Sequence, residues 1–207
     1  MRTVLVTGGT VRLGKAIADH LRAAGWRVLT SSHRPGSGAD IIADLSEPMG
    51  AAKLYAGCIN LLGGDPPDAL VNNAALFTGD EAAMASVNLE APRKLVMMMA
   101  GREDGRGKVV NILDTRVLSQ PAADAYGRTK RDLMEWSAKA AAMFADTLNV
   151  NSVAPGPVLA PVGVHEAAGE CPLGRPTPEA VARAVGFLLE ADYTSGCVIP
   201  VDGGRSL

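Results

Sequence analysis

The sequence predicts a doubly wound α/β domain, in which helices cover both faces of a parallel β-sheet. Short apolar, β-branched runs alternate with helical stretches along the chain, beginning with Thr3–Val6. A glycine-rich turn, Thr7–Gly9, joins that run to a helix whose apolar residues repeat every four positions from Leu13 to Leu21. Parallel neighbours need crossover connections, and this alternation supplies them.

Six further strands are expected from the same pattern of short apolar runs separated by helical or mixed stretches. They are Arg27–Thr30, Ile41–Asp44, Asp68–Asn72, Lys108–Leu113, Val150–Val153 and Cys197–Val201. Ligands of open α/β sheets bind beyond the carboxyl ends of the strands. The residues directly after each strand are therefore the candidate functional residues.

Length and composition narrow the class of protein. The 207 residues suit one domain with a sizeable core, so we expect residues 1–207 to form a single domain. Lys and Arg number 20 against 22 Asp and Glu, which does not favour nucleic acid or an anionic membrane as partner. No apolar run approaches the roughly 18 residues of a membrane helix, and the opening residues are not typical of a signal peptide. Three cysteines without a CxxC pair favour a reducing cytoplasm, and the expected partner is a small molecule.

The turn after the first strand is a candidate phosphate-binding loop, with the sequence TGGTVRLG over Thr7–Gly14. Backbone N–H groups and the positive end of the following helix would meet the phosphates of a dinucleotide there. A tight turn also needs glycine for structural reasons, but the position between a strand and a helix favours the functional interpretation. The predicted contacts are Gly8, Thr10, Arg12 and Leu13.

The end of the second strand indicates which cofactor is bound. NAD-preferring proteins usually place an acidic residue there to hold the ribose 2′-hydroxyl. This chain has the sequence TSSHR over Thr30–Arg34, so that His33 and Arg34, with Arg12, could bind a 2′-phosphate. NADPH is the predicted cofactor, with a plain solvated loop as the alternative for Arg34 taken alone.

Tyr126 and Lys130 are the candidate acid–base pair. Their four-residue spacing places them on one face of a helix expected to continue to about Asp146. A nearby ammonium favours phenolate and lowers a phenol pKa from its usual value of about 10. Tyr126 could then exchange a proton with a carbonyl or an imine, although a core tyrosine beside a surface lysine is the structural alternative.

Polar residues follow two other predicted strands. Asp114 emerges after Leu113 and could donate or accept a proton if burial raised its pKa, or be an ordinary turn aspartate. Asn73 and Ala74 follow another strand and would line the cofactor site, with Asn88 on the next helix. Taken singly, an asparagine is more often a cap or turn residue.

Together these motifs resemble the short-chain dehydrogenase/reductase family over nearly the full chain. The matching segments are Thr7–Gly14, Asp44-Leu45, Asn72–Ala74, Asn88, Tyr126–Lys130, Pro155-Gly156 and Val201–Gly204. The resemblance implies a twisted, seven-stranded Rossmann sheet, hydride transfer from a nicotinamide, an Asn-Ser-Tyr-Lys catalytic set and a homotetramer. It also assigns Asp44, Leu45, Pro155 and Gly156 to the cofactor site.

Two departures from the common pattern resemble the pteridine and dihydromonapterin reductases: Arg12 replaces a loop glycine, and Asp114 replaces the catalytic serine. The pair His33-Arg34 and the aromatic Phe77 fit the same subgroup. Phe77 would stack a flat pterin against the nicotinamide, or serve as core filler. The remaining roles implied are proton donation by Tyr126, contact of Lys130 with the ribose and Tyr126, positioning or protonation of substrate by Asp114, and a catalytic Asn88.

The substrate stays open between a pterin-like C=N and a carbonyl or 3-oxoacyl thioester. Ala75 stands where the subgroup usually has a serine, and the expected lid near 158–175 is short and rich in Ala, Gly and Pro. A non-catalytic NADP(H) sensor is a third hypothesis, motivated by the missing serine and opposed by the retained Tyr126, Lys130 and Asn88. No metal site is expected, since His165 and Cys171 lack ligand spacing.

Overall fold

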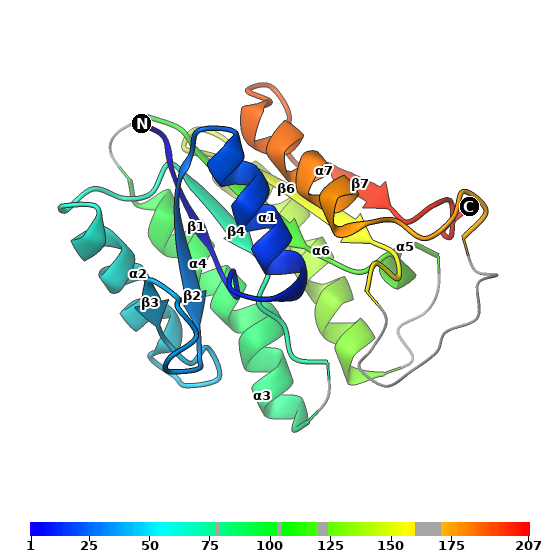
Figure 1. The fold of residues 1–207 in the computed structure, drawn as a ribbon, viewed down its shortest axis with the longest axis horizontal. Helices are drawn as coiled ribbons and strands as arrows, with labels where there is room; N and C mark the ends of the chain where they lie inside the picture. Colours follow the sequence, from blue (N-terminus) through cyan, green and yellow to red (C-terminus); the bar gives the residue numbers. More distant parts are fainter. Residues whose placement is uncertain (78, 103–104, 120–123, 160–170) are drawn as a thin grey trace.

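A computed structural model describes residues 1–77, 79–102, 105–119, 124–159 and 171–207. They form a seven-stranded, all-parallel sheet in the order β3-β2-β1-β4-β5-β6-β7 (Figure 1). The strands are β1 Thr3–Val6, β2 Arg27–Ser32, β3 Ile41–Ile42, β4 Ala69–Asn72, β5 Gly107–Ile112, β6 Leu148–Pro155 and β7 Val198–Val201. The predicted single-domain, doubly wound fold is confirmed.

Helices cover both faces of this sheet, and the clearest two-helix layer is α1 and α7, which lie side by side (Figure 1). The helices are α1 Arg12–Ala23, α2 Gly50–Leu61, α3 Glu81–Ala85, the π-helical turn η1 Ser86–Glu90, α4 Ala91–Ala100, α5 Arg116–Ser119, α6 Ala125–Met143 and α7 Pro178–Glu190. Alternate strand residues face opposite layers: Val4 and Val6 pack with α1 and α7, and Leu5 packs with α2, α4 and α6. A large apolar core therefore lies on each face of the sheet.

Several predicted element boundaries differ from those observed, most of them by one or two residues. The third strand ends at Ile42 instead of Asp44, because the Asp44 carboxylate accepts hydrogen bonds from the backbone and hydroxyl of Ser46 and turns the chain. Strand β6 is eight residues long, twice the predicted Val150–Val153, since the two residues at each end are also buried and paired with neighbouring strands. Helix α6 ends at Met143, short of Asp146.

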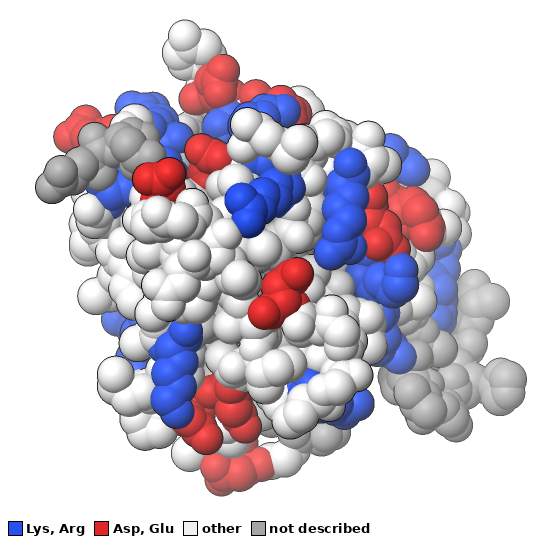
Figure 2. All heavy atoms as spheres, turned by 60° about the vertical axis from the view of Figure 1, so that its left-hand side comes forward, with Lys and Arg blue, Asp and Glu red and all other residues white. Residues whose placement is uncertain are grey.

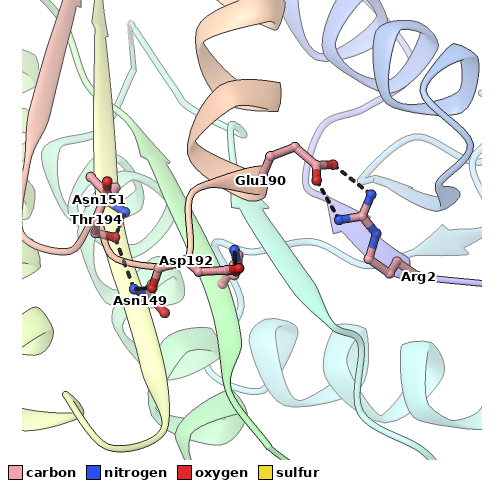
Figure 3. A network of polar contacts seen from close by, with 7 residues as sticks. Arg2, Asn149, Asn151, Glu190, Asp192 and Thr194 are labelled. Atoms are coloured by element: carbon pink, nitrogen blue, oxygen red, sulfur yellow. Dashed lines mark hydrogen bonds and ion pairs between the residues drawn. The ribbon is translucent and has the colours of Figure 1, made fainter.

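Buried amides explain why polar residues belong to β6. The Asn149 side chain donates to the carbonyls of Asp192 and Thr194 at 3.1 Å each, and Asn151 donates to Thr194 at 2.7 Å (Figure 3). On the same side of the molecule, both terminal nitrogens of Arg2 meet the Glu190 carboxylate at 2.7 Å. The loop after α7 is thereby tied to the start of β1 and to β6.

The surface carries charges of both signs. On the face shown in Figure 2, Lys and Arg side chains are interspersed with Asp and Glu, in keeping with a net charge of −2. Among the helices within the described ranges, none combines the length and apolar character that crossing a membrane requires.

Candidate active site

A cavity of about 1260 Å³ opens at the carboxyl edge of the sheet. Pockets for one small ligand usually occupy about 300–1,000 Å³, so this cavity has room for a dinucleotide and a second molecule. Of the predicted site residues, those that line it are Gly8, Thr10, Arg12, Leu13, His33, Arg34, Asp44, Leu45, Asn73, Ala74, Phe77, Asp114, Tyr126, Lys130, Pro155 and Gly156. The sequence motifs thus converge on one place.

The turn between β1 and α1 depends on two glycines. Gly8 has a φ of +62°, and a Cβ built on Gly14 would lie 2.1 Å from the Gly8 carbonyl oxygen. The Asn73 amide ties this turn to the end of β4 by donating to the carbonyls of Thr7 and Gly8 at 2.9 and 3.2 Å. Helix α1 has no side-chain cap and no acidic residue in its first turn, which leaves its positive end suited to an anion.

Arg12 adopts a strained backbone conformation. Its φ of 50° makes it the one non-glycine residue with positive φ in the described ranges. The left-handed conformation costs an ordinary residue about 1–2 kcal/mol, and such outliers cluster at functional sites. The Arg12 guanidinium lines the cavity and approaches the carbonyl oxygen of Leu159 at 3.5 Å.

The end of β2 presents exposed basic groups to the same cavity. Arg34 Nε donates to His33 Nε2 at 3.3 Å, and both residues line the cavity wall. A nearby carboxylate, Asp40, is engaged elsewhere: one of its oxygens accepts from the backbone N–H of Thr30 at 2.7 Å and from its hydroxyl at 2.8 Å. The wall at this point therefore carries His33 and Arg34, with the Asp44 carboxylate close to His33.

Tyr126 and Lys130 lie one turn apart on α6, as predicted. Lys130 is only 2% exposed, and its Nζ donates to the carbonyl of Ile112 at 2.8 Å. Burial lowers the pKa of Lys130 to about 8. The Nζ atom is 5.8 Å from the centre of the Tyr126 ring.

The predicted lowering of the Tyr126 pKa is wrong for this structure. Burial, assisted by the negative charge of Asp114, raises the pKa of the phenol above its ordinary value, although Arg116 opposes the shift. Desolvation of the charged form outweighs the favourable cations. Tyr126 is accordingly held as a neutral phenol, the form that can give up a proton.

Asp114 and Phe77 reach the same end of the cavity, where they meet Arg116. Asp114 Oδ1 accepts from the backbone N and Nε of Arg116 at 2.9 and 3.2 Å, and Oδ2 accepts from Nη2 at 3.2 Å. The Phe77 and Tyr126 rings meet edge-to-face with centres 4.9 Å apart. Phe77 is 57% exposed, which argues against a core-filling role.

Asn88 is the one predicted site residue that does not line the cavity. It lies in the π-helical turn η1, fully buried, where its amide bonds both the N–H and the carbonyl of Leu76 at 2.8 Å. Its Nδ2 also lies 3.2 Å from the Thr129 hydroxyl. Asn88 therefore holds the loop before Phe77 against α6 from a buried position outside the cavity.

The C-terminal segment supplies contacts that the sequence analysis missed. Asp202 is buried and accepts hydrogen bonds from the Thr115 hydroxyl and from the backbone of Gly204 and Ser206. Arg205 lines the cavity, and no local sequence signal points to it. Arg116 also lines the cavity, and its position two residues after Asp114 could have indicated its role.

The expected lid near 158–175 lies partly outside the described ranges, because residues 160–170, including His165, are not described. The expectation of no metal site can be compared only with the rest of the chain. In the part of the chain that is described, no three His, Cys, Asp or Glu side chains are grouped as metal ligands would be.

Comparison with known proteins identifies the family. A family model described as "Enoyl-(Acyl carrier protein) reductase" matches residues 64–206, well over half of the chain. The chain belongs to the short-chain dehydrogenase/reductase family. A curated relative in that family, the rhamnolipids biosynthesis 3-oxoacyl-[acyl-carrier-protein] reductase of Pseudomonas aeruginosa, is 29% identical and aligns over 100% of this chain and 96% of its own.

Solved structures of short-chain reductases superpose on the whole domain. FolM alternative dihydrofolate reductase 1 from Brucella canis, complexed with NADP, has a TM-score of 0.87 and 30% identity, covering 99% of this chain and 94% of its own. The Pseudomonas aeruginosa RhlG/NADP complex has a TM-score of 0.88 and 27% identity, covering 100% and 96%. The resemblance stated from the motifs is thus confirmed at the level of the oxidoreductase family.

Proposed function

We propose that this protein is an NADPH-dependent reductase that transfers hydride to a pterin-like C=N bond, with Tyr126 as proton donor. The observation that carries the proposal is that Tyr126, Phe77 and Asp114 line the same cavity as Arg12, His33 and Arg34, with the Tyr126 and Phe77 ring centres 4.9 Å apart. A proton donor, a flat stacking surface and a polar anchor are the parts that reduction of a heteroaromatic ring requires.

The residues present fit an NADPH molecule. The Gly8–Gly14 turn with its uncapped helix end would hold the pyrophosphate, and Arg12, His33 and Arg34 the 2′-phosphate. The strain at Arg12 supports this role, because a glycine would adopt the same conformation without cost. Bound NADPH would supply the hydride. The remaining proposed contacts are Thr10, Leu13, Asp44, Leu45, Asn73, Ala74, Tyr126, Lys130, Pro155 and Gly156.

The chain's own contribution to the reaction is the proton. Tyr126 is held as a neutral phenol and would give its hydroxyl proton to the substrate nitrogen or oxygen. The ammonium of Lys130, buried beside it, would stabilise the phenolate that forms. Asn88 keeps the wall beside this pair in place through Leu76 and Thr129.

A carbonyl or 3-oxoacyl thioester is a second candidate substrate, favoured by the pairing of Asp114. A carboxylate has about four acceptor positions, and Arg116 takes three of them. A pterin would then gain little from Asp114, whereas a carbonyl needs only the Tyr126 hydroxyl. The similarity to the rhamnolipids biosynthesis reductase supports this alternative, as the similarity to FolM supports the first.

Activity assays can separate these substrates. Purified protein is given NADPH with a panel of dihydropterins and, separately, a 3-oxoacyl thioester, and oxidation of NADPH is followed by absorbance. We expect turnover of a dihydropterin that falls about 10²–10⁴-fold in Tyr126→Phe, with the affinity for NADPH unchanged. Turnover of the thioester alone would establish the second candidate, and NADPH binding without any Tyr126-dependent turnover would indicate a sensor.

The proposal includes a homotetramer in the cytoplasm. Large apolar side chains stand exposed on two helices, Met97 on α4 and Phe187 on α7, where another subunit could cover them. Cys58, Cys171 and Cys197 are free thiols, as in a reducing compartment. Light scattering of the purified protein at several concentrations tests the assembly.

A further inference from the structure

We infer that Arg116 is a positioning residue of the reaction, which offsets the charge of Asp114 beside Tyr126 and so favours loss of the phenol proton. The inference rests on the proposed role of Tyr126 as proton donor. It follows from the contacts that Arg116 makes on three sides within the cavity wall.

The first contact fixes Asp114. Three donors of Arg116, the backbone N, Nε and Nη2, bind the two carboxylate oxygens at 2.9 to 3.2 Å. The planar guanidinium matches a carboxylate in a way that an ammonium does not. Both side chains are mostly buried, at 31% and 22% exposure, so their pairing is only partly screened by water.

The second contact is with the aromatic pair. The guanidinium carbon of Arg116 lies 5.3 Å from the centre of the Tyr126 ring and 5.8 Å from that of Phe77. A cation at this distance over a phenol ring favours the phenolate. Arg116 therefore acts on the reacting group as well as on Asp114.

The third contact, with Asp124, belongs to a set of two positive and two negative groups around the Tyr126 phenol. The charged groups that face Tyr126 are Asp114 from the turn after β5, Arg116 from α5, Asp124 at the N-cap of α6, and Lys130 from α6. Arg116 Nη1 also lies 3.7 Å from Asp124 Oδ2. Two carboxylates face two cations, and loss of Arg116 would leave the carboxylates in excess where a phenolate must form.

The position of Arg116 is set by the fold. Thr115, the residue before it, donates its hydroxyl to the buried Asp202 and its backbone N–H to the carbonyl of Pro155 at 2.9 Å. Arg116 is thus held beside Tyr126 by the C-terminal segment and the end of β6.

A titration of the phenol tests this inference without requiring turnover. A difluorotyrosine is incorporated at position 126 so that the phenol becomes more acidic, and fluorine NMR follows its ionisation against pH. We expect Arg116→Ala to raise the pKa of the phenol by about 1 unit or more. Arg116→Lys keeps the charge but loses the paired guanidinium donors, and it should raise this pKa less. Combining Arg116→Ala with Asp114→Asn should bring the pKa back toward the parent value.

A matched control removes a cation outside the cavity. Arg128, two residues from Tyr126 on α6, is exposed and pairs with Glu81 at 3.2 Å, and Arg128→Ala should leave the titration unchanged. An unshifted pKa in Arg116→Ala, or the same shift with and without Asp114→Asn, would overturn the inference. A shift without any turnover of pterin or thioester would instead count against the proposed function, while the effect of Arg116 on the phenol would be established.

Discussion

At the scale of single residues, Arg12 is the position where local stability and the proposed function conflict. Its backbone takes a conformation suited to glycine, while Arg12 lines the same cavity as His33 and Arg34. The strain costs about 1–2 kcal/mol, and a charge-assisted contact with a phosphate is worth about 1.5–3 kcal/mol. A phosphate bound by this side chain would therefore offset the strain.

Replacing Arg12 by glycine should separate the two effects. We expect Arg12→Gly to weaken NADPH binding about 10-fold or more, with little change in NADH binding and no loss in the free energy of unfolding. Fluorescence titration and urea unfolding measure these quantities. Arg12→Ala is the control, since it removes the cation but keeps the strain. Equal losses for NADPH and NADH would contradict the phosphate contact.

At the scale of elements, the polar middle of β6 decides how β7 joins the sheet. Asn151 is buried, its Nδ2 donates to the Thr194 carbonyl at 2.7 Å, and its Oδ1 accepts from the Cys197 backbone at 3.1 Å. These bonds fix the loop that leads into β7. That strand in turn precedes Asp202, which holds the turn containing Asp114 and Arg116.

Loss of the Asn151 amide should destabilise the domain from within the sheet. We expect Asn151→Ala to lower the free energy of unfolding by about 1–3 kcal/mol, because the Cys197 N–H loses its partner and the Thr194 carbonyl keeps only the bond from Asn149. Urea unfolding followed by circular dichroism measures the change. Asn60→Ala, an exposed asparagine on α2, should be nearly neutral, and equal effects at the two positions would refute this account.

At the scale of the whole molecule, the cavity joins both halves of the sheet. Its wall takes residues from the ends of β1, β2, β4, β5 and β6. A ligand that bridges these ends binds only the folded chain, and a ligand at about 100 times its dissociation constant stabilises the native state by about 2.7 kcal/mol. The preference for one cofactor should therefore be measurable as a larger increase in the free energy of unfolding.

Stability in the presence of each cofactor tests the preference for NADPH. At equal concentrations, NADPH should raise the urea midpoint of the parent protein more than NADH does. Arg34→Ala should reduce the effect of NADPH and leave that of NADH nearly unchanged, since only the 2′-phosphate loses a partner. If Arg34→Ala reduced the stabilisation by NADPH and the stabilisation by NADH equally, Arg34 would not distinguish the two cofactors.

Features governed by short-range geometry could be predicted from the sequence. The strand, glycine turn and helix over Thr3–Leu21 follow from hydrophobic periodicity and from the backbone freedom of glycine. The helical repeat alone places Tyr126 and Lys130 on one face. The set of motifs resembles the oxidoreductase family, and several of its members, such as Asn73, Asp114 and Gly156, follow strands of one parallel sheet.

Other features were decided only by tertiary structure, since they depend on groups far apart in the chain. Packing places Asn88 behind the wall, draws Arg205 into it and sets Arg116 over the Tyr126 ring. It also reverses the expected direction of the Tyr126 pKa, because the desolvation of a phenol is a property of the assembled core. The sequence alone determined which groups are available for chemistry, and the fold decided which of them meet and how strongly each is shielded from water.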